Sequence, residues 1–376
     1  MNFNIPKTVS FSGEKLWKMK KDGIVSDTVL AELKKLADDS LSGELLAVTE
    51  RVMRASSGNP HDYASIGTYW WPNPDTPDGL PYIRRDGKGS PMATDTVTYR
   101  KMSERAFLLS LAAYYFDSSE YGRAAEKILY DWHLNPETYM TPHARYAQSI
   151  PGICDGRGIG IIDFSMSSYR VFDSVGILES LGFIAEENVV GLKRWYNEFT
   201  DWILTSECGI EEDCEPNNHG TYSDVQLIAL AAFTGREALL KKILTTSYER
   251  RFREQVEPDG SQPLELRRTK GMIYSISNLR ALMLIAGMAA DNGYTEYLSP
   301  DEKYGDVVIK KALDYLYPYA VSFDSFPYEE FKPELVPERM KAVLLWADGR
   351  FAKEGYIDKA DLISNKFILE SAYPGI

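Results

Sequence analysis

The sequence is poor in cysteine and histidine and has no long apolar run. Its 376 residues include only three cysteines, Cys154, Cys208 and Cys214, too few for a disulfide scaffold in a chain of this size. Cys208 and Cys214 either close a small loop in an oxidising compartment or stay as two thiols. No uninterrupted apolar run reaches about 18 residues, so we expect no membrane span. The N-terminus lacks the basic-then-apolar pattern of a secretion signal. An exported protein whose signal has been removed would look the same, so this absence leaves the compartment open.

Signatures of metal, serine-hydrolase and dinucleotide chemistry are missing as well. The sequence has no HExxH, no Cys/His cluster, no DxDxDG loop and no GxSxG. Closely spaced glycines occur in GRGIGIID, residues 156–163, but without the strand that precedes a dinucleotide-binding loop. We expect these glycines to let the backbone pass close to another element. The sequence therefore predicts no metal and no cofactor.

Positive charge is in deficit. Lys and Arg number 42 against 55 Asp and Glu, which gives a formal net charge of −13. Nucleic-acid binding depends on a basic face, so we expect no nucleic-acid partner. A protein of this charge also repels anionic substrates at long range. A polyanionic substrate would therefore need a local cluster of arginines.

Helical periodicity dominates the chain, and convincing alternating strands are nearly absent. Helices joined by short polar connections favour paired helices stacked side by side. No repeat of fixed period is visible, which favours an α/α toroid over a solenoid. We therefore expect one all-α catalytic domain over residues 1–376. Expected helices cover residues 27–54, 97–116, 119–132, 167–184, 187–205, 222–234, 236–256, 270–290, 301–316, 337–352 and 357–373.

Two long stretches, residues 57–95 and 136–163, resist helical assignment and are rich in Gly, Pro and Tyr. Loops of this length in a compact fold are usually functional. Aromatic faces stack on sugar rings and arginine forks pair with carboxylates, although buried tryptophans can equally pin a loop to its domain. The candidate binding residues are Tyr69, Trp70, Trp71, Arg84 and Arg85 in the first stretch, and His143 and Gln148 in the second.

The motif NNHG begins at Asn217, just before an apolar helix. Asn217 or Asn218 can serve as the helix N-cap, the usual role of Asn at such a place. A second Asn followed by one of only four histidines is harder to explain by capping alone. His219 and Tyr222 stand three residues apart and would share a face of the helix.

A second polar cluster lies at residues 262–282. Thr269 is the expected N-cap of the helix that follows, which leaves Arg267 and Arg268 in the preceding loop. Arg268 can then point into a cleft that Tyr274 reaches from the first turns of the helix. The alternative is structural: Glu265 pairs with an arginine and Tyr274 is a half-buried helix residue.

Taken in order, YWWPNPDTPDGLPYIRRDG, GRGIGIID, NNHG, and ELRRT followed by Tyr274 resemble the alginate-lyase-like superfamily of polysaccharide lyases. The resemblance is closest to polysaccharide lyase family 38, more distant to the family 5 alginate lyases, and covers roughly residues 50–300. It implies an α/α toroid of about seven helical pairs. It also implies β-elimination on 1,4-linked uronate polymers, alginate or glucuronan, which leaves unsaturated uronate ends and needs no redox cofactor. We expect a periplasmic or secreted enzyme of bacterial-type polysaccharide utilisation.

Carried over by position, the resemblance implies that Asn218 and Arg268 neutralise the uronate carboxylate as negative charge grows in the transition state. Family 5 spacing would select Arg267 instead, whereas the ELxRT pattern favours Arg268. Tyr274 is the implied catalytic tyrosine and His219 the implied histidine. Arg267, Tyr222 and Glu265 complete the candidate substrate-binding residues.

Stereochemistry divides the roles. In mannuronate and glucuronate the C5 proton and the C4 oxygen lie on the same side, so Tyr274 alone can take the proton and return it. In guluronate they lie on opposite sides, and His219 would be the base and Tyr274 the acid. Two other functions stay open: a glycoside hydrolase with two carboxylates, and a non-catalytic sugar-binding protein. Elimination would create an ultraviolet-absorbing double bond, whereas hydrolysis or binding alone would create none.

Overall fold

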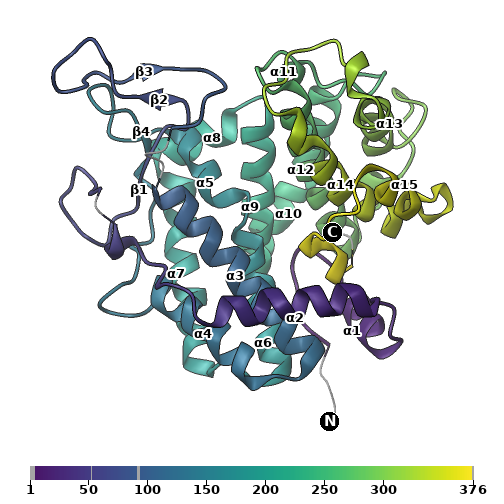
Figure 1. Ribbon diagram of the computed structural model, residues 1–376, viewed down its shortest axis with the longest axis horizontal. Coiled ribbons are helices and arrows are strands. Elements are labelled where there is room, and N and C mark those ends of the chain that lie inside the picture. The colour runs from purple at the N-terminus through teal and green to yellow at the C-terminus, as the bar shows by residue number, and fades with distance from the viewer. Residues whose placement is uncertain (1–4, 52, 91–93, 375–376) are drawn as a thin grey trace. The chain divides into compact units, whose positions relative to one another are not determined.

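The computed structural model describes residues 5–51, 53–90 and 94–374, and helices dominate them (Figure 1). They divide into two compact units. Unit 1 consists of Met1–Lys7, Lys35–Glu215 and Leu230–Arg236, and unit 2 consists of Thr8–Lys34, Pro216–Ala229 and Glu237–Ile376. The second half of α2 (Asp27–Leu41) and the end of α9 (Asn218–Thr234) belong to unit 1.

Unit 1 is a helical layer with short strands at one end. Its α3 (Thr94–Phe116) packs on α4 (Ser119–His133) and α6 (Ser168–Leu181), and α7 (Glu186–Thr205) contacts α4 and α8 (Glu207–Cys214). The buried aromatic residues Tyr99, Trp132 and Phe164 fill the space between these helices, with ring centroids 4.6–5.4 Å apart. Because α3, α4, α6 and α7 bury apolar residues, their apolar periodicity correctly predicted helices in this part of the sequence.

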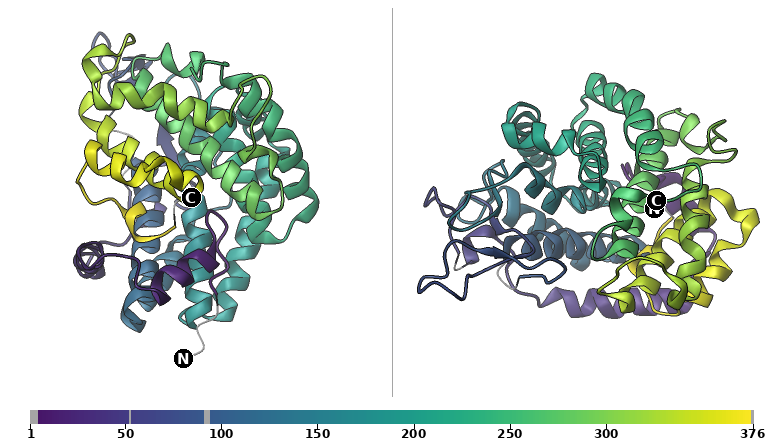
Figure 2. Two further views of the ribbon diagram at one scale, coloured as in Figure 1. Left: turned by 90° about the vertical axis from the view of Figure 1, so that its right-hand side faces the viewer. Right: turned by 90° about the horizontal axis from the view of Figure 1, so that it is seen from above.

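The strands of unit 1 organise the two long stretches that lack helical periodicity. The first strand, β1 (Ala64–Ile66), pairs in parallel with β4 (Tyr146–Ser149), which ties the first stretch to the second. A hairpin of β2 (Trp70–Trp71) and β3 (Ile83–Arg84) extends away from the helices of this unit (Figure 1, Figure 2). Short α5 (Ile162–Ser165) ends the second stretch. Residues 91–93 of the first stretch lie outside the described residues.

Unit 2 is built around α12 (Gly271–Asp291). This helix contacts α10 (Glu237–Ser247), α11 (Pro263–Leu266), α13 (Val308–Val321) and α14 (Val336–Phe351), and α15 (Tyr356–Ile363) packs on α14 (Figure 1). By length and composition α12 could cross a membrane, but 83% of its most apolar window is buried inside the protein. Its apolar residues therefore serve as core. The remaining helix, α1 (Gly13–Lys21), has Ser12 as its N-cap.

Several expected helix boundaries are wrong. The helix expected over 27–54 ends at Leu41. There the Arg105 guanidinium donates a hydrogen bond to the Ser40 carbonyl oxygen and occupies the space beside Gly43. The helix expected at 301 begins at Val308, after an antiparallel bridge between Asp301 and Asp306.

Two further helices expected from periodicity are also different. The helix expected to end at 373 stops at Ile363. The segment expected as one helix over 236–256 is α10 followed by a π-helical turn, Tyr248–Arg253.

Candidate active site

The candidate residues fall into the two units. Asn218, His219, Tyr222, Glu265, Arg267, Arg268 and Tyr274 belong to unit 2, and Tyr69, Trp70, Trp71, Arg84, Arg85, His143 and Gln148 belong to unit 1. The groups are described in turn.

Asn218 and Glu265 form a buried pair at the start of α9. The backbone N–H and the side-chain Nδ2 of Asn218 each donate to one carboxylate oxygen of Glu265, both at 2.7 Å. Both side chains are almost inaccessible, at 2% and 1% exposure. Since an ionised carboxylate only accepts hydrogen bonds, it fixes which way the Asn218 amide faces. One Nδ2–H bond remains for another acceptor.

Asn217 is the residue that caps this helix. Its Oδ1 accepts the backbone N–H of His219 at 2.9 Å, the geometry of an N-cap, so Asn217 satisfies the α9 end. Asn218 is thereby released from the capping role that the sequence left open to either asparagine. His219 follows on the first turn with a half-buried side chain.

Arg268 and Tyr274 are in direct contact. Arg268 Nη2 donates to the Tyr274 hydroxyl oxygen at 3.2 Å, and the guanidinium carbon lies 4.2 Å from the centre of the tyrosine ring. A cation in this position stabilises negative charge on the phenolic oxygen. Arg267 is exposed at the end of α11. As expected, both arginines precede α12.

Glu265 connects these two pairs electrostatically. Burial raises the pKa of Glu265, and the two hydrogen bonds from Asn218 and the charges of Arg268 and His219 oppose that rise. A carboxylate at the N-terminus of α9 also interacts favourably with the helix dipole. Of the four residues implied as catalytic, Asn218 is hydrogen-bonded to Glu265, and Arg268 and His219 interact with its charge. The fourth, Tyr274, is hydrogen-bonded to Arg268.

The start of α12 is held by a distant segment that we call the clasp, Glu329–Phe331. Glu330 Oε2 accepts the backbone N–H of Ile273 at 3.0 Å, Gly271 donates to the Glu329 carbonyl at 2.9 Å, and Phe331 donates to the Thr269 carbonyl at 3.1 Å. The expectation that Thr269 caps α12 is therefore wrong. The Thr269 hydroxyl oxygen is buried without a hydrogen-bond partner, and the carboxylate of Glu330, 57 residues beyond Ile273, does the capping.

A buried amide network supports the floor of this cluster. Asn278 Nδ2 on α12 donates to the side-chain oxygens of Gln255 and Gln262, at 3.1 and 2.9 Å, and Thr221 on α9 donates to the same Gln255 oxygen at 2.9 Å. Tyr222 is 2% exposed, and its hydroxyl donates to the Ser277 carbonyl of α12 at 3.1 Å. These contacts lock α9 against α12, so that the side chains at their N-terminal ends keep a fixed spacing.

In unit 1 the expected aromatic loop is an ordered hairpin. Trp70 pairs with Arg84 and Trp71 with Ile83, and the Trp71 indole N–H donates to the Lys88 carbonyl at 2.9 Å. The Arg85 guanidinium lies 5.4 Å from the centre of the Trp71 ring. Both tryptophans and Tyr69 are half-buried.

The two arginines of the hairpin are exposed. Arg84 forms an ion pair with Asp86 at 2.8 Å. The hairpin therefore offers both aromatic surface and positive charge.

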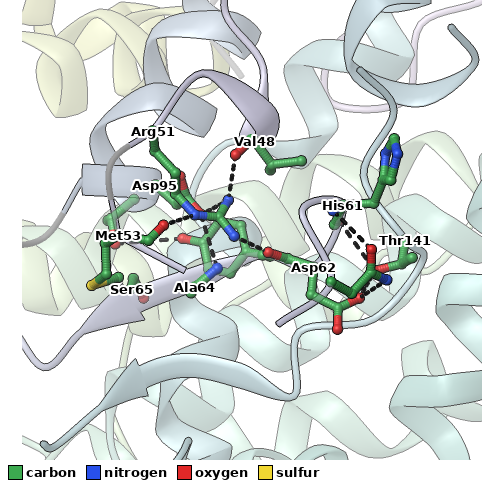
Figure 3. Close-up of polar contacts among 12 residues, drawn as sticks. Val48, Arg51, Met53, His61, Asp62, Ala64, Ser65, Asp95 and Thr141 are labelled. Carbon is green, nitrogen blue, oxygen red and sulfur yellow. Dashed lines mark hydrogen bonds and ion pairs between the residues drawn. The ribbon is translucent and has the colours of Figure 1, made fainter. Parts of the chain in front are cut away.

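His143 lies beside a second buried acid. Its Nε2 is 3.3 Å from Asp62 Oδ1, which also accepts the Thr141 hydroxyl at 2.6 Å. Burial lowers the pKa of His143, and Asp62 partly offsets this. Figure 3 shows how Arg51 holds this region: it donates to the backbone carbonyls of Val48, Met53 and Asp62 and pairs with Asp95.

The glycines of GRGIGIID behave as expected. A Cβ on Gly156 would lie 1.9 Å from the Arg145 carbonyl oxygen, and one on Gly160 would lie 2.5 Å from that of Ala147. The segment therefore passes against β4 where only glycine fits. Gln148, the last buried residue of that strand, has a positive φ of 48°.

Within the described part of the chain, no group of three or more His, Cys, Asp or Glu side chains could hold a metal ion. The three cysteines are free thiols, Cys208 and Cys214 at opposite ends of α8.

Sequence reasoning missed Glu330 and the buried Asp163, which binds Gln148, and it left the cap of α9 open between Asn217 and Asn218. The first has no local signal, because the clasp is remote from α12 in the chain. Asp163 belongs to the GRGIGIID motif, whose acidic end could have drawn attention to it.

The alginate lyase family model matches residues 47–326, and the chain belongs to the alginate lyase family. No curated protein matches it.

Known structures agree with this membership. An alginate lyase from Bacteroides ovatus is 34% identical, with a TM-score of 0.90 over 96% of this chain and 97% of that one. Alginate lyase A1-III from Sphingomonas species A1 is 14% identical, with a TM-score of 0.58 over 90% and 92%. A histidine-to-alanine variant of A1-III, solved with a tetrasaccharide, is 13% identical, with a TM-score of 0.51 over 93% and 95%. These similarities confirm the expected all-α, α/α-toroid fold class, and the enzyme is a polysaccharide lyase.

Proposed function

We propose that this enzyme cleaves 1,4-linked uronate polymers, alginate, glucuronan or both, by β-elimination. In this reaction the C5 proton beside the uronate carboxylate is removed, the C4–O bond breaks, and a C4–C5 double bond forms. The electron pair of the C–H bond passes through an enediolate before the leaving oxygen departs. The protein must therefore stabilise negative charge on the carboxylate and move one proton.

Asn218 and Arg268 are the proposed neutralising groups. Asn218 keeps one amide N–H bond available while the other is held by Glu265. The Arg268 guanidinium has five N–H donors and spends one on Tyr274, so it can bond the substrate carboxylate as well. Donors fixed before the reaction stabilise developing charge without a cost of reorganisation.

Tyr274 is the proposed proton carrier. For mannuronate and glucuronate, its phenolic oxygen takes the C5 proton and returns it to the C4 oxygen on the same side. The Arg268 guanidinium beside that oxygen stabilises the phenolate that begins the cycle. His219 then orients or neutralises the substrate, and for guluronate it is the proposed base.

The contact between Arg268 and Tyr274 carries this proposal. A tyrosine that serves only packing has no need of a guanidinium on its hydroxyl, whereas a proton carrier does. The neighbouring Asn218–Glu265 pair adds an oriented donor within the same unit.

The test is an absorbance assay on polymannuronate, polyguluronate and glucuronan with the purified protein. We expect ultraviolet absorbance from the conjugated double bond to grow on at least one polymer, with unsaturated ends found by mass spectrometry. Chain shortening without that absorbance would show hydrolysis and contradict the proposal. Binding without any shortening would show a sugar-binding protein instead.

A periplasmic or secreted location is also proposed. The support for this location is the size of the proposed substrate, since a long uronate polymer is met first outside the cytoplasmic membrane. Fractionation of cells that express the native gene, with detection by antibody, tests this location.

A further inference from the structure

Arg157, in the second long stretch of unit 1, is held in a fixed orientation without an acidic ion-pair partner among the described residues. Its Nε donates to the Gln148 backbone carbonyl at 3.0 Å and its Nη2 to the Gln148 side-chain oxygen at 2.9 Å. The side chain is half-buried. Two of its five N–H bonds are used, so three remain for a ligand.

Gln148 is itself locked from behind. Its Nε2 donates to Asp163 Oδ1 at 2.9 Å, and its backbone N–H donates to the Ser65 hydroxyl at 2.7 Å. Asp163 also accepts hydrogen bonds of 2.6–2.9 Å from the hydroxyl groups of Tyr63, Ser65 and Thr96. Both side-chain ends of Gln148 are therefore occupied inside the protein, and its role is to position Arg157.

The positive φ of Gln148 points the same way. A residue with a side chain rarely adopts φ near +48°, and such strained positions persist where the surroundings enforce them, often at functional sites. Here the buried Asp163 enforces it. The nearest carboxylates do not pair with Arg157: Asp163 is occupied by four donors, and Glu211 accepts the backbone N–H of Gly158 at 3.0 Å.

The surroundings of the guanidinium match a uronate ring. A Cβ on Gly67 would lie 2.6 Å from Trp70 Cδ1 and 2.7 Å from Arg157 Nη2, so the indole edge and the guanidinium meet at this glycine. Arg84 stands opposite Trp70 in the hairpin, and its charge lowers the pKa of Arg157, though less than burial does. An aromatic surface and two neighbouring cations complement the apolar face and the carboxylate of one sugar acid.

We propose that Arg157 binds the carboxylate of a uronate unit that stacks on Trp70, with Gln148 as its positioning residue. The class of ligand rests on the proposed function. This site lies wholly within unit 1 and uses none of the residues assigned to the reaction. It recognises the charge of a sugar acid.

The test measures binding in a Tyr274→Phe background, in which turnover is expected to be slow. Calorimetry is carried out with mannuronate and glucuronate oligomers and with the same oligomers reduced at the carboxyl group. Arg157→Met should raise the Kd for the acidic oligomers at least about tenfold, because charge-assisted hydrogen bonds are lost. The Kd for the reduced oligomers should not change. Arg123→Met, which removes an exposed arginine from α4 of the same unit, is the matched control and should leave both Kd values unchanged.

Gln148→Gly separates positioning from charge. Glycine accepts the positive φ and keeps the backbone carbonyl that binds Arg157, but the side-chain contact is lost. We expect a smaller rise in Kd for the acidic oligomers than in Arg157→Met, again with the reduced oligomers unaffected. This variant also carries the test if Arg157→Met fails to fold.

Equal Kd values for acidic oligomers in the parent, Arg157→Met and Gln148→Gly would overturn the proposal. So would equal losses for acidic and reduced oligomers, which would indicate general damage to the loop. The unmodified enzyme separates this failure from that of the proposed function. If it produces unsaturated ends while Arg157→Met binds as tightly as its parent, the function stands and only this site is refuted.

Discussion

Replacing Glu265 by Gln tests whether the buried carboxylate orients Asn218. The carboxylate accepts two 2.7 Å hydrogen bonds from Asn218, one from the backbone and one from the side chain. A glutamine presents one oxygen and one NH₂ group, so one of the two N–H groups of Asn218 faces another donor. Either that bond is lost or the Asn218 amide turns over and presents its oxygen to the glutamine.

The magnitude follows from the lost bond. A hydrogen bond to a charged group contributes about 1.5–3 kcal/mol, and we expect the free energy of unfolding to fall by about that amount. If the oriented Asn218 amide is needed in the transition state, the same energy lowers kcat about 10- to 150-fold. If Asn218 stabilises charge that develops in the reaction, as proposed, kcat and kcat/KM should fall together, with little change in KM.

The assay is steady-state elimination followed by absorbance, with unfolding by urea measured on the same preparations. Asp224→Asn is the matched control, because Asp224 is another buried carboxylate of α9, bonded to Ser247 at 2.7 Å and to Arg251 at 3.0 Å. That variant should lose stability and keep its turnover per folded molecule. A folded Glu265→Gln variant with the turnover of the parent enzyme would refute the reasoning.

Four further predictions follow from the same contacts. Tyr274→Phe keeps the ring and should lower kcat by about 10²–10⁴-fold with little change in binding; retention of most turnover would contradict its role as proton carrier. Neutralising Arg84 and Arg85 together should raise KM more than it lowers kcat, and an unchanged KM would remove the hairpin from substrate binding. Glu330→Ala should lower the free energy of unfolding in urea by about 1 kcal/mol and lower kcat several-fold, and Glu330→Gln should restore most of both. An unchanged kcat in Glu330→Ala would show that the clasp does not support the site. Burial raises the pKa of Asp95 from 3.8 to about 7 against the opposing charge of Arg51, so the folded state holds a proton that the unfolded chain releases, and stability should fall as pH rises from about 4 to about 7. Unfolding of Asp95→Asn between pH 5 and 8 should show a flatter profile, and an equal slope would contradict the assignment.

Local patterns in the sequence predicted the parts of the site that local forces determine. Apolar periodicity predicted α12 over 270–290, close to its observed bounds, because a buried helix needs apolar residues on its faces. The closely spaced glycines of GRGIGIID predicted a close backbone approach, which the geometry at Gly156 and Gly160 confirms. The two arginines before α12 were also predicted to lie outside the helix, as they do.

Features that depend on distant residues could not be predicted. Asn217 and Asn218 are chemically identical as caps, and only the position of Glu265 decides which of them is drawn away from the helix end. Thr269 has the residue type and place of an N-cap, but the clasp supplies a charged acceptor instead. The left-handed backbone of Gln148 could not be predicted either, because a positive φ is expected at glycine, and several glycines follow it in the same stretch.

The clasp also bears on where this enzyme can be cut. The family match ends at residue 326, and Glu329–Phe331 lie just after it. A fragment trimmed to the matched region would leave the N–H groups of Gly271 and Ile273 without their acceptors, directly below Arg268 and Tyr274. The segment matched by the family model is thus shorter than the segment that holds the start of α12. We therefore expect substitutions in the clasp to alter turnover in this chain without touching any residue of the matched region.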